Sequence, residues 1–343
     1  MSSRVMSTLE SFAPSMEVYS IDEAFLDLTG VCHRNPTAYG HQIRKAVVRA
    51  TGIPVCVGMA PTKTLAKLAN YAAKKWKHTE GVLDLSNPTR REKLMKLVPV
   101  GEVWGIGSKT SAKLNKMGII TVWDLACQSS QRIHTQFNVV VARTVMELNG
   151  IACMELEDIT PNKQQIVCSR SFSRRLTSYN ELSQALAEFC SRAAEKLRHQ
   201  DSVTGCISIF IRTSPFNPQE PHYERSATLK LTSATQDTRT LINAANRLLT
   251  EIFRMGFNYQ KCGVQLSHLQ PVTKLGQTEL FDFVGDSLPT ENRPLMATMD
   301  KINKRFPKKL SIAATGTDKS WQPKTERISQ RYTTDWKELA LVK

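Results

Sequence analysis

The chain has 343 residues, of which 41% are apolar and 22% charged, and a net charge of +15. This composition excludes a collagen, a coiled-coil rod and a disordered acidic tail. No run approaches the roughly 18 consecutive apolar residues of a membrane span, and the N-terminus lacks the apolar core of a secretion signal. We therefore expect a cytoplasmic protein. The charge favours a polyanionic partner, most often nucleic acid, although a merely soluble basic protein has the same charge.

Residues 1–88 alternate between helical and extended patterns. Apolar spacing predicts one helix before Pro14, a second that ends at Gly52 and a third that opens at Pro61-Thr62. Apolar and β-branched runs predict strands at 18–21, 24–28, 53–59 and 82–85. This pattern indicates an α/β layer. Because its short first helix has nothing upstream to cover its apolar face, we expect the beginning of the layer to be absent.

Residues 89–161 are predicted to form short helices around the turn Gly105-Ile106-Gly107. Ser108 is a candidate N-cap for the helix that follows, and Gly118 a candidate C-cap. Glycines permit positive φ and close backbone approach, so amides at the helix start can meet a phosphate. A helix-hairpin-helix grips the DNA backbone in this way without reading bases. A plain corner between two helices is the alternative.

Residues 162–270 have the clearest pattern, a strand–helix–strand–strand–helix–strand order. It predicts a ferredoxin-like βαββαβ domain with a four-stranded sheet covered on one face by two helices. Ser178 to Glu181 form a capping box at the start of its first helix. Residues 271–343 lack sustained periodicity apart from a predicted helix over Pro294–Phe306, and we expect an appendage ordered against the rest of the chain or a partner. The fold class is therefore α+β and multidomain.

Two adjacent acids, Asp22 and Glu23, interrupt an otherwise apolar, strand-like run. Buried unpaired carboxylates are costly, so the pair lies either at a solvated hairpin turn or beside a bound cation. Phosphoryl transfer with two Mg²⁺ ions needs carboxylate oxygens near the attacking and leaving oxygens, and this pair could supply part of that cage.

A stripe of lysines, Lys63, Lys67 and Lys74, lies on one face of the helix that opens at Pro61-Thr62. An ammonium group suits phosphate binding. A solvated helix face gives the same pattern and is the simpler interpretation. The eight cysteines have no two members closer than 15 residues, so zinc-binding spacing does not occur, and we expect reduced and buried thiols.

Five motifs together resemble the UmuC type of Y-family DNA polymerase, the catalytic subunit of bacterial SOS mutagenesis polymerases. In chain order they are Val18–Gly30, Gly58–Ala69, Val103–Gly107, Cys168–Phe172 and Ser329–Thr334. The resemblance covers essentially the whole chain. It implies a partial palm at 1–88, a thumb with a helix-hairpin-helix at 89–161, a DNA-binding little finger at 162–270 and a UmuC-type tail at 271–343.

This resemblance implies error-prone, Mg²⁺-dependent nucleotidyl transfer across damaged DNA in the SOS response. The implied partners are primer-template DNA, deoxynucleoside triphosphates, a UmuD-type processed dimer, a sliding clamp and RecA. By motif position, Asp22 is a metal-ligating carboxylate, Glu23 its partner on the side of the primer 3′ end, and Lys74 a contact to the incoming triphosphate. The expected contacts to the DNA backbone are Gly105, Ile106, Gly107 and Lys109.

A clamp-binding peptide is implied at Gln277, Leu280 and Phe281, although Thr278 stands where leucine is usual. An ordinary linker is the alternative. The sequence also departs from the family pattern at its start, because family members begin with a palm strand that carries the first catalytic Asp, followed by the fingers. We therefore expect an N-terminally truncated polymerase whose two-ion cage lacks a ligand and which has little activity of its own.

Two other hypotheses follow from the same departure. One is a non-catalytic DNA-binding remnant that occupies primer ends or sequesters clamp and UmuD-type partners. The other is a product that does not fold, because its palm sheet lacks a central strand.

Overall fold

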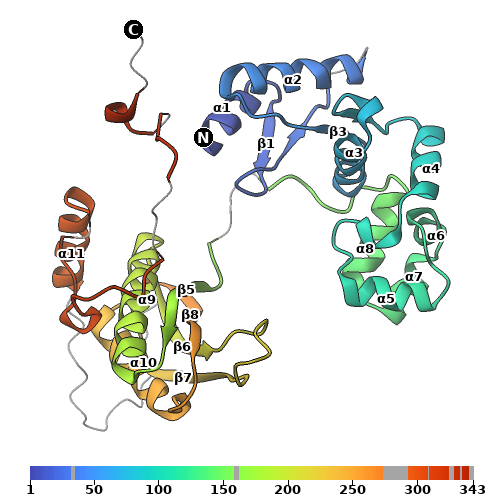
Figure 1. Cartoon of the computed structure of the whole chain (residues 1–343). Coiled ribbons are helices and arrows are strands. Elements are labelled where there is room, and N and C mark those ends of the chain that lie inside the picture. Colours follow the sequence, from blue (N-terminus) through green and yellow to red (C-terminus); the bar gives the residue numbers. More distant parts are fainter. Residues whose placement is uncertain are drawn as a thin grey trace. The chain divides into compact units, whose positions relative to one another are not determined.

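The computed structural model describes residues 1–31, 35–157, 162–272, 293–307, 309–323, 328–332 and 334–339. They form two compact units, Met1–Thr160 and Pro161–Lys343, each with its own sheets and core (Figure 1). The predicted palm and thumb both fall in the first unit. Within the described ranges, every helix is too short or too polar to span a bilayer.

The first unit begins with two small, separate sheets. Its elements are α1 (Ser2–Glu10), β1 (Ser15–Val18), β2 (Ala24–Asp27), α2 (Pro36–Thr51), β3 (Val57–Met59), α3 (Lys63–Lys75), η1 (Lys77–Thr79) and β4 (Val82–Asp84). β1 and β2 form an antiparallel hairpin, and β3 pairs with β4 in parallel. Among the described residues β2 and β3 do not pair, so the predicted layer consists of two strand pairs.

The helix ends follow the predicted signals, whereas the strands are shorter than their apolar runs. The Thr62 hydroxyl accepts a hydrogen bond from the Leu65 amide at the start of α3, and α2 ends at Gly52 with φ of 72°. The expected strand at 18–21 is wrong, because the amides of Tyr19 and Ser20 both donate to the Glu23 carbonyl and close the hairpin turn there. Of the run 53–59, only β3 pairs.

Five helices and one 3-10 turn complete the described part of the first unit. They are α4 (Pro88–Leu97), η2 (Val100–Glu102), α5 (Ser108–Lys116), α6 (Val122–Ala126), α7 (Ser130–Gln136) and α8 (Val139–Leu148). The apolar face of α3 belongs to the same buried cluster as these helices. Fully buried Glu147 on α8 accepts hydrogen bonds from the amides of Thr64 and Cys153, at 3.0 and 2.7 Å. Its carboxylate thereby ties the start of α3 to α8.

A glycine sets the distance between β3 and α3. A Cβ at Gly58 would lie 2.2 Å from the Asn70 amide nitrogen and 2.4 Å from the Ala66 carbonyl oxygen. Because these are backbone atoms, they have no rotamer by which to move aside. The strand therefore runs directly against the helix that carries the lysine stripe.

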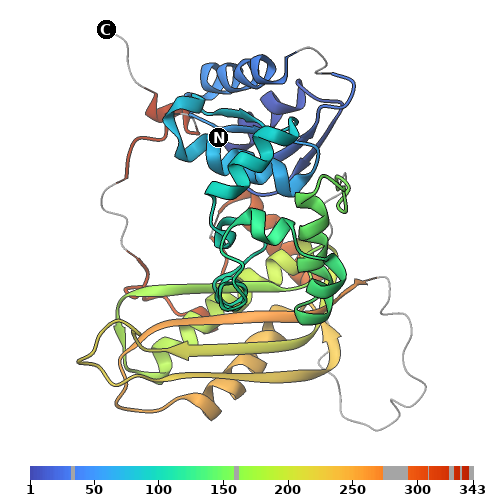
Figure 2. The same cartoon turned by 90° about the vertical axis from the view of Figure 1, so that its right-hand side faces the viewer.

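The second unit has the βαββαβ order that the sequence predicts. Its elements are β5 (Ile166–Leu176), α9 (Tyr179–His199), β6 (Ser202–Arg212), β7 (Glu224–Thr235), α10 (Thr238–Ile252) and β8 (Tyr259–Pro271). The antiparallel sheet has the strand order β5-β8-β6-β7, and Figure 2 shows both helices on one side of it. The predicted capping box is wrong: the Ser178 side chain makes no capping hydrogen bond, and Glu181 pairs instead with Arg174.

Part of the C-terminal tail packs into this second unit. It contains α11 (Arg293–Arg305), η4 (Ala313–Thr315) and η5 (Trp336–Glu338). Trp321 is 2% exposed and meets the rings of Phe172 and Phe189 edge-to-face, with centroids 5.8 Å apart in each case. The Ser173 amide of β5 donates to the Trp321 carbonyl. The segment is thus ordered against the rest of the chain, as expected.

Candidate active site

The two adjacent acids lie in the turn that joins β1 to β2. Asp22 is exposed, and its carboxylate accepts a hydrogen bond of 2.6 Å from the Ser20 hydroxyl. Glu23 is half-buried, and its Oε1 lies 2.6 Å from the Lys67 ammonium on α3. The acids thus lie on a hairpin turn, and the cationic group beside Glu23 is the Lys67 ammonium.

Both acids line a cavity of about 560 Å³ in the first unit. Residues of β2, β3 and α3 contribute to its wall, with Lys63, Lys67 and Asn70 among them. Asn70 Oδ1 is buried and has no hydrogen-bond partner among the described residues. Buried oxygens are usually satisfied, so this atom is an available acceptor on the cavity wall.

The donor set fits a magnesium ion that is shared with a substrate. Mg²⁺ in phosphoryl-transfer sites is held by one or two carboxylates together with water and substrate phosphates. Asp22 and Glu23 supply two such carboxylates on one cavity. In the described ranges, this cavity included, no three His, Cys, Asp or Glu side chains cluster in a way that would by themselves hold a metal ion. An ion here would take its remaining ligands from substrate or water.

Asp27 also lines this cavity, at the end of β2, but its carboxylate is already engaged. Hydrogen bonds from the side chain and the amide of Thr29 hold the pKa of Asp27 below its usual value. The carboxylate therefore stays ionised while it caps the turn that follows the strand.

The three lysines of the stripe lie in two different environments. Lys63 forms an ion pair with Glu17, and both side chains are only 11% exposed. Lys67 pairs with Glu23, so the prediction of a solvated helix face is wrong for both lysines. Lys74 is exposed in the last turn of α3 and is not among the residues that line the cavity. The structure does not bring Lys74 together with the acids.

The glycine turn has the geometry expected of a backbone-binding hairpin. Gly105 has φ of 87°, and a Cβ at Gly105 or Gly107 would meet open space. Gly107, not Ser108 as predicted, is the N-cap of α5, because Ser108 is already helical. Ile106 is buried and its amide donates to the Val103 carbonyl, so this residue anchors the turn in the core. Lys109 is exposed beside the helix start.

The second unit presents a polar sheet face opposite its helices. Along β6, Ile207, Ile209 and Ile211 are buried in the core, so the alternate residues point to the other face. Register then places basic and hydroxyl side chains together on that open sheet face: Ser208, Arg212, Thr228, Lys230 and Lys261. The Ser208 and Thr228 hydroxyls are 2.7 Å apart.

The sequence indicated Lys67 only as a member of the lysine stripe and gave no individual role to Tyr19 or Trp104, which meet it beside Glu23. The two aromatic residues lie inside motifs that the sequence did single out, Val18–Gly30 and Val103–Gly107. Tyr19 precedes the acids by three positions, and Trp104 directly precedes Gly105. That position inside two candidate motifs was the available signal. The clamp-peptide residues Gln277, Leu280 and Phe281 lie outside the described residues.

Three sequence models of one family match separate parts of this chain. Sequence models of the impB/mucB/samB family, of its HHH motif and of its C-terminal domain match residues 1–71, 88–119 and 163–280. Residues 293–342 match a domain of unknown function, DUF4113.

Individual relatives agree with these matches. Protein UmuC of Salmonella typhimurium is 48% identical over 347 residues, which span all of this chain and 81% of the relative. Protein ImpB of the same species is 45% identical, with the same shares of each chain covered. A DNA polymerase IV of Clostridium acetobutylicum is 28% identical, over 89% of this chain and 73% of the relative.

A solved Y-family DNA polymerase chimera has a similar fold. It superimposes with a TM-score of 0.59 and 21% identity, over 79% of this chain and 75% of the chimera. The chain therefore belongs to the UmuC, ImpB, MucB and SamB family and has the fold of the Y-family DNA polymerases.

Proposed function

We propose that this chain is the polymerase subunit of a bacterial SOS mutagenesis system and carries out template-directed nucleotide addition across damaged DNA. One observation carries the proposal: two carboxylates share a cavity at the β1–β2 turn in a chain related over its whole length to Protein UmuC. The polymerase assignment of the family agrees with the DNA polymerase IV relative and with the fold.

In this proposal Asp22 and Glu23 hold Mg²⁺ against the phosphates of an incoming deoxynucleoside triphosphate. The ion supplies charge neutralisation for the phosphate oxygens when it is bound. Asp22 is already oriented by the Ser20 hydroxyl, whereas Glu23 has to exchange its contact with Lys67. Lys74, farther along α3, is the proposed contact to the far end of the triphosphate, where its exposed ammonium is accessible.

DNA binding is assigned to two surfaces, one in each unit. Amides at the start of α5 and the Lys109 ammonium meet backbone phosphates at the hairpin of Gly105, Ile106 and Gly107, with Ile106 as its buried anchor. The open sheet face of the second unit supplies further hydroxyl and cationic contacts. In domain terms, residues 1–88 act as the palm, 89–161 as the thumb, 162–270 as the little finger and 271–343 as the tail.

The proposed partners are primer-template DNA, deoxynucleoside triphosphates, a UmuD-type processed dimer, the sliding clamp and RecA, in the cytoplasm. The clamp would use Gln277, Leu280 and Phe281. The non-catalytic DNA-binding alternative is not favoured, because a relative that matches 89% of this chain is named as a DNA polymerase.

Primer extension on an undamaged template and on a template with one abasic site tests the proposal. Contrary to the expectation of little activity stated above, the proposal requires that the full chain extends the primer with Mg²⁺. Asp22→Asn combined with Glu23→Gln should reduce extension by at least about a thousandfold. Glu92→Gln is the matched control, since Glu92 is an exposed acid that pairs with Lys96 on α4. Equal extension by the double variant and the wild type would refute the assignment of the acids. No extension by any form would refute catalysis by this chain.

A further inference from the structure

The ammonium of Lys67 has three partners beside the proposed metal site. It lies 2.6 Å from Glu23 Oε1, 5.1 Å from the centroid of the Tyr19 ring and 5.9 Å from that of Trp104. Its side chain is 19% exposed, although it carries a full charge. A cation over two aromatic faces and against a carboxylate is held by electrostatic attraction from all of them.

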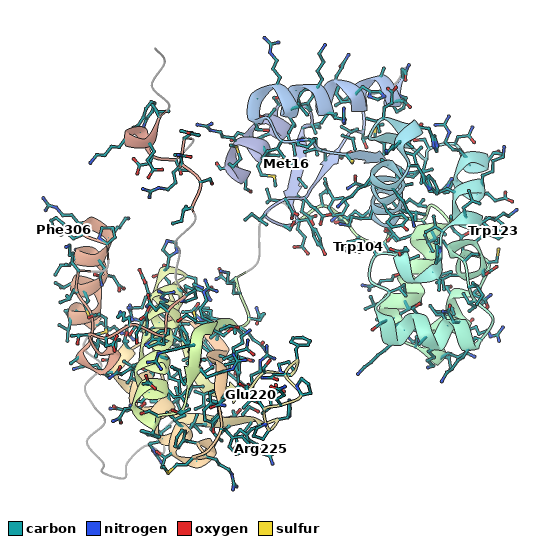
Figure 3. All side chains as sticks on the ribbon, viewed as in Figure 1. Met16, Trp104, Trp123, Glu220, Arg225 and Phe306 are labelled. Carbon is teal, nitrogen blue, oxygen red and sulfur yellow. The ribbon has the colours of Figure 1, made fainter. Side chains whose placement is uncertain are left out.

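The two rings hold each other in place as well. Trp104 and Tyr19 meet edge-to-face with centroids 5.4 Å apart, and the indole N–H donates to the Tyr19 hydroxyl at 3.1 Å. Phe25 of β2 packs against both rings. Trp104, labelled in Figure 3, is the residue directly before Gly105. The aromatic cluster therefore connects the proposed DNA-binding hairpin to the β1–β2 turn that carries Asp22 and Glu23.

A fixed positive charge beside Glu23 lowers the affinity of its carboxylate for a divalent metal ion. A divalent ion beside Glu23 lies close to the Lys67 ammonium and is repelled by it unless the ammonium moves away. The aromatic rings oppose such a movement, because they keep the ammonium within reach of the carboxylate. Metal binding at Glu23 therefore costs the free energy of the Glu23–Lys67 contact, which has to be broken.

We propose that Lys67 is a built-in counter-cation for Glu23, kept in place by Tyr19 and Trp104, and that a divalent ion has to displace it. Lys67 and Trp104 are positioning residues in this scheme. The inference rests on the proposed function, since it takes Glu23 as a metal ligand. It differs from that function in predicting that loss of a side chain strengthens metal binding, which damage to the structure would not do.

Mn²⁺ binding to the full chain without DNA or nucleotide, measured by electron paramagnetic resonance, tests the proposal. Lys67→Met should tighten Mn²⁺ binding about tenfold, because a positive charge next to the ion is removed. Lys67→Arg should restore wild-type affinity. The matched control is Lys96→Met, since Lys96 also pairs with a glutamate at 2.6 Å and lies 5.2 Å from a tryptophan ring, that of Trp123. This control should leave Mn²⁺ affinity unchanged.

A double-mutant cycle tests whether Trp104 acts through Lys67. Trp104→Leu should tighten Mn²⁺ binding about threefold, and in the Lys67→Met background it should have no further effect. Trp123→Leu should change nothing. Unchanged or weaker binding by Lys67→Met would overturn the inference. If Glu23→Gln also leaves Mn²⁺ binding unchanged, the metal site of the proposed function fails with it, whereas weaker binding by Glu23→Gln confines the failure to Lys67.

Discussion

The second unit and the first half of the first unit differ in how their strands pair. In the second unit four strands form one paired sheet over a single buried cluster, which the tail extends with Trp321. In the first unit the strands form two separate pairs, and one strand of each pair, β2 or β3, borders a cavity whose wall also includes Glu23, Lys63 and Lys67. In the second unit the packed core leaves the proposed DNA-binding surface on the outside of the sheet, whereas the divided sheet of the first unit leaves a cavity for the proposed metal site.

The largest effect on stability should come from the second unit. Trp321→Ala should lower its free energy of unfolding by about 3–5 kcal/mol, because the indole fills the space between Phe172 and Phe189. Denaturant unfolding followed by circular dichroism measures this loss. Trp336→Ala is the matched control, since that tryptophan is 87% exposed and should contribute less than about 0.5 kcal/mol. An equal loss in both variants would contradict the role of the tail in the core.

A smaller loss is expected at the cavity wall of the first unit. Lys63→Met leaves Glu17 without its cation in a largely buried position and should cost about 2–3 kcal/mol. The exposed pair of Lys96 and Glu92 gives the comparison, and Lys96→Met should cost less than about 1 kcal/mol. Thermal unfolding of the two variants checks the difference. Equal costs would mean that burial at the cavity does not strengthen the pair.

Substitution of the lysines near the hairpin should have a smaller energetic effect, and the effect on DNA affinity should depend on salt concentration. Lys109→Ala with Lys116→Ala removes two exposed cations near the hairpin, so the slope of log affinity against log salt should fall by about 1.8 for duplex DNA. Fluorescence anisotropy at several salt concentrations measures the slope. Lys45→Ala, on α2, is the control. An unchanged slope would show that these lysines do not meet phosphates.

The last prediction involves no substitution. Labelling of cysteine thiols compares how accessible the interiors of the two units are. Burial raises the pKa of the Cys190 and Cys262 thiols in the second unit, so little reactive thiolate forms at either position at mildly basic pH. Iodoacetamide at pH 8 should label exposed Cys127 in the first unit and leave those two unmodified, as peptide mass spectrometry can check. Labelling of Cys262 before unfolding would show that the second core opens more easily than its packing indicates.

The helices and the βαββαβ order could be predicted because local chemistry determines them. Thr62 caps α3, Gly52 ends α2, and the apolar spacing of α9 and α10 indicates one covered face. Four of the seven cysteines in the described part of the chain are buried, as expected, whereas Cys127 is exposed and Cys56 and Cys153 are half-buried. The extent of the strands could not be predicted, since an apolar run reports burial and not backbone pairing, as residues 53–59 show.

The sequence indicated residues of the candidate site only where a motif spans neighbouring positions. Asp22 and Glu23 are adjacent in the sequence, and the hairpin glycines are two residues apart. The contacts that orient them cross long separations: Lys67 reaches Glu23 over 44 residues, and Trp104 reaches Tyr19 over 85. The spacing of residues in a helix indicates which side chains share a face, but it does not identify the residues from other elements that contact that face.

Gly58 links these contacts to a single position in the chain. An alanine there would push the backbone of α3 away from β3, and the displacement would move Lys63 and Lys67 together, because one rigid helix carries both. Glu17 and Glu23 would then lose their partners at the same time, although neither acid lies near position 58 in the sequence. A saturation library at this codon should consequently return glycine alone among clones that keep both ion pairs.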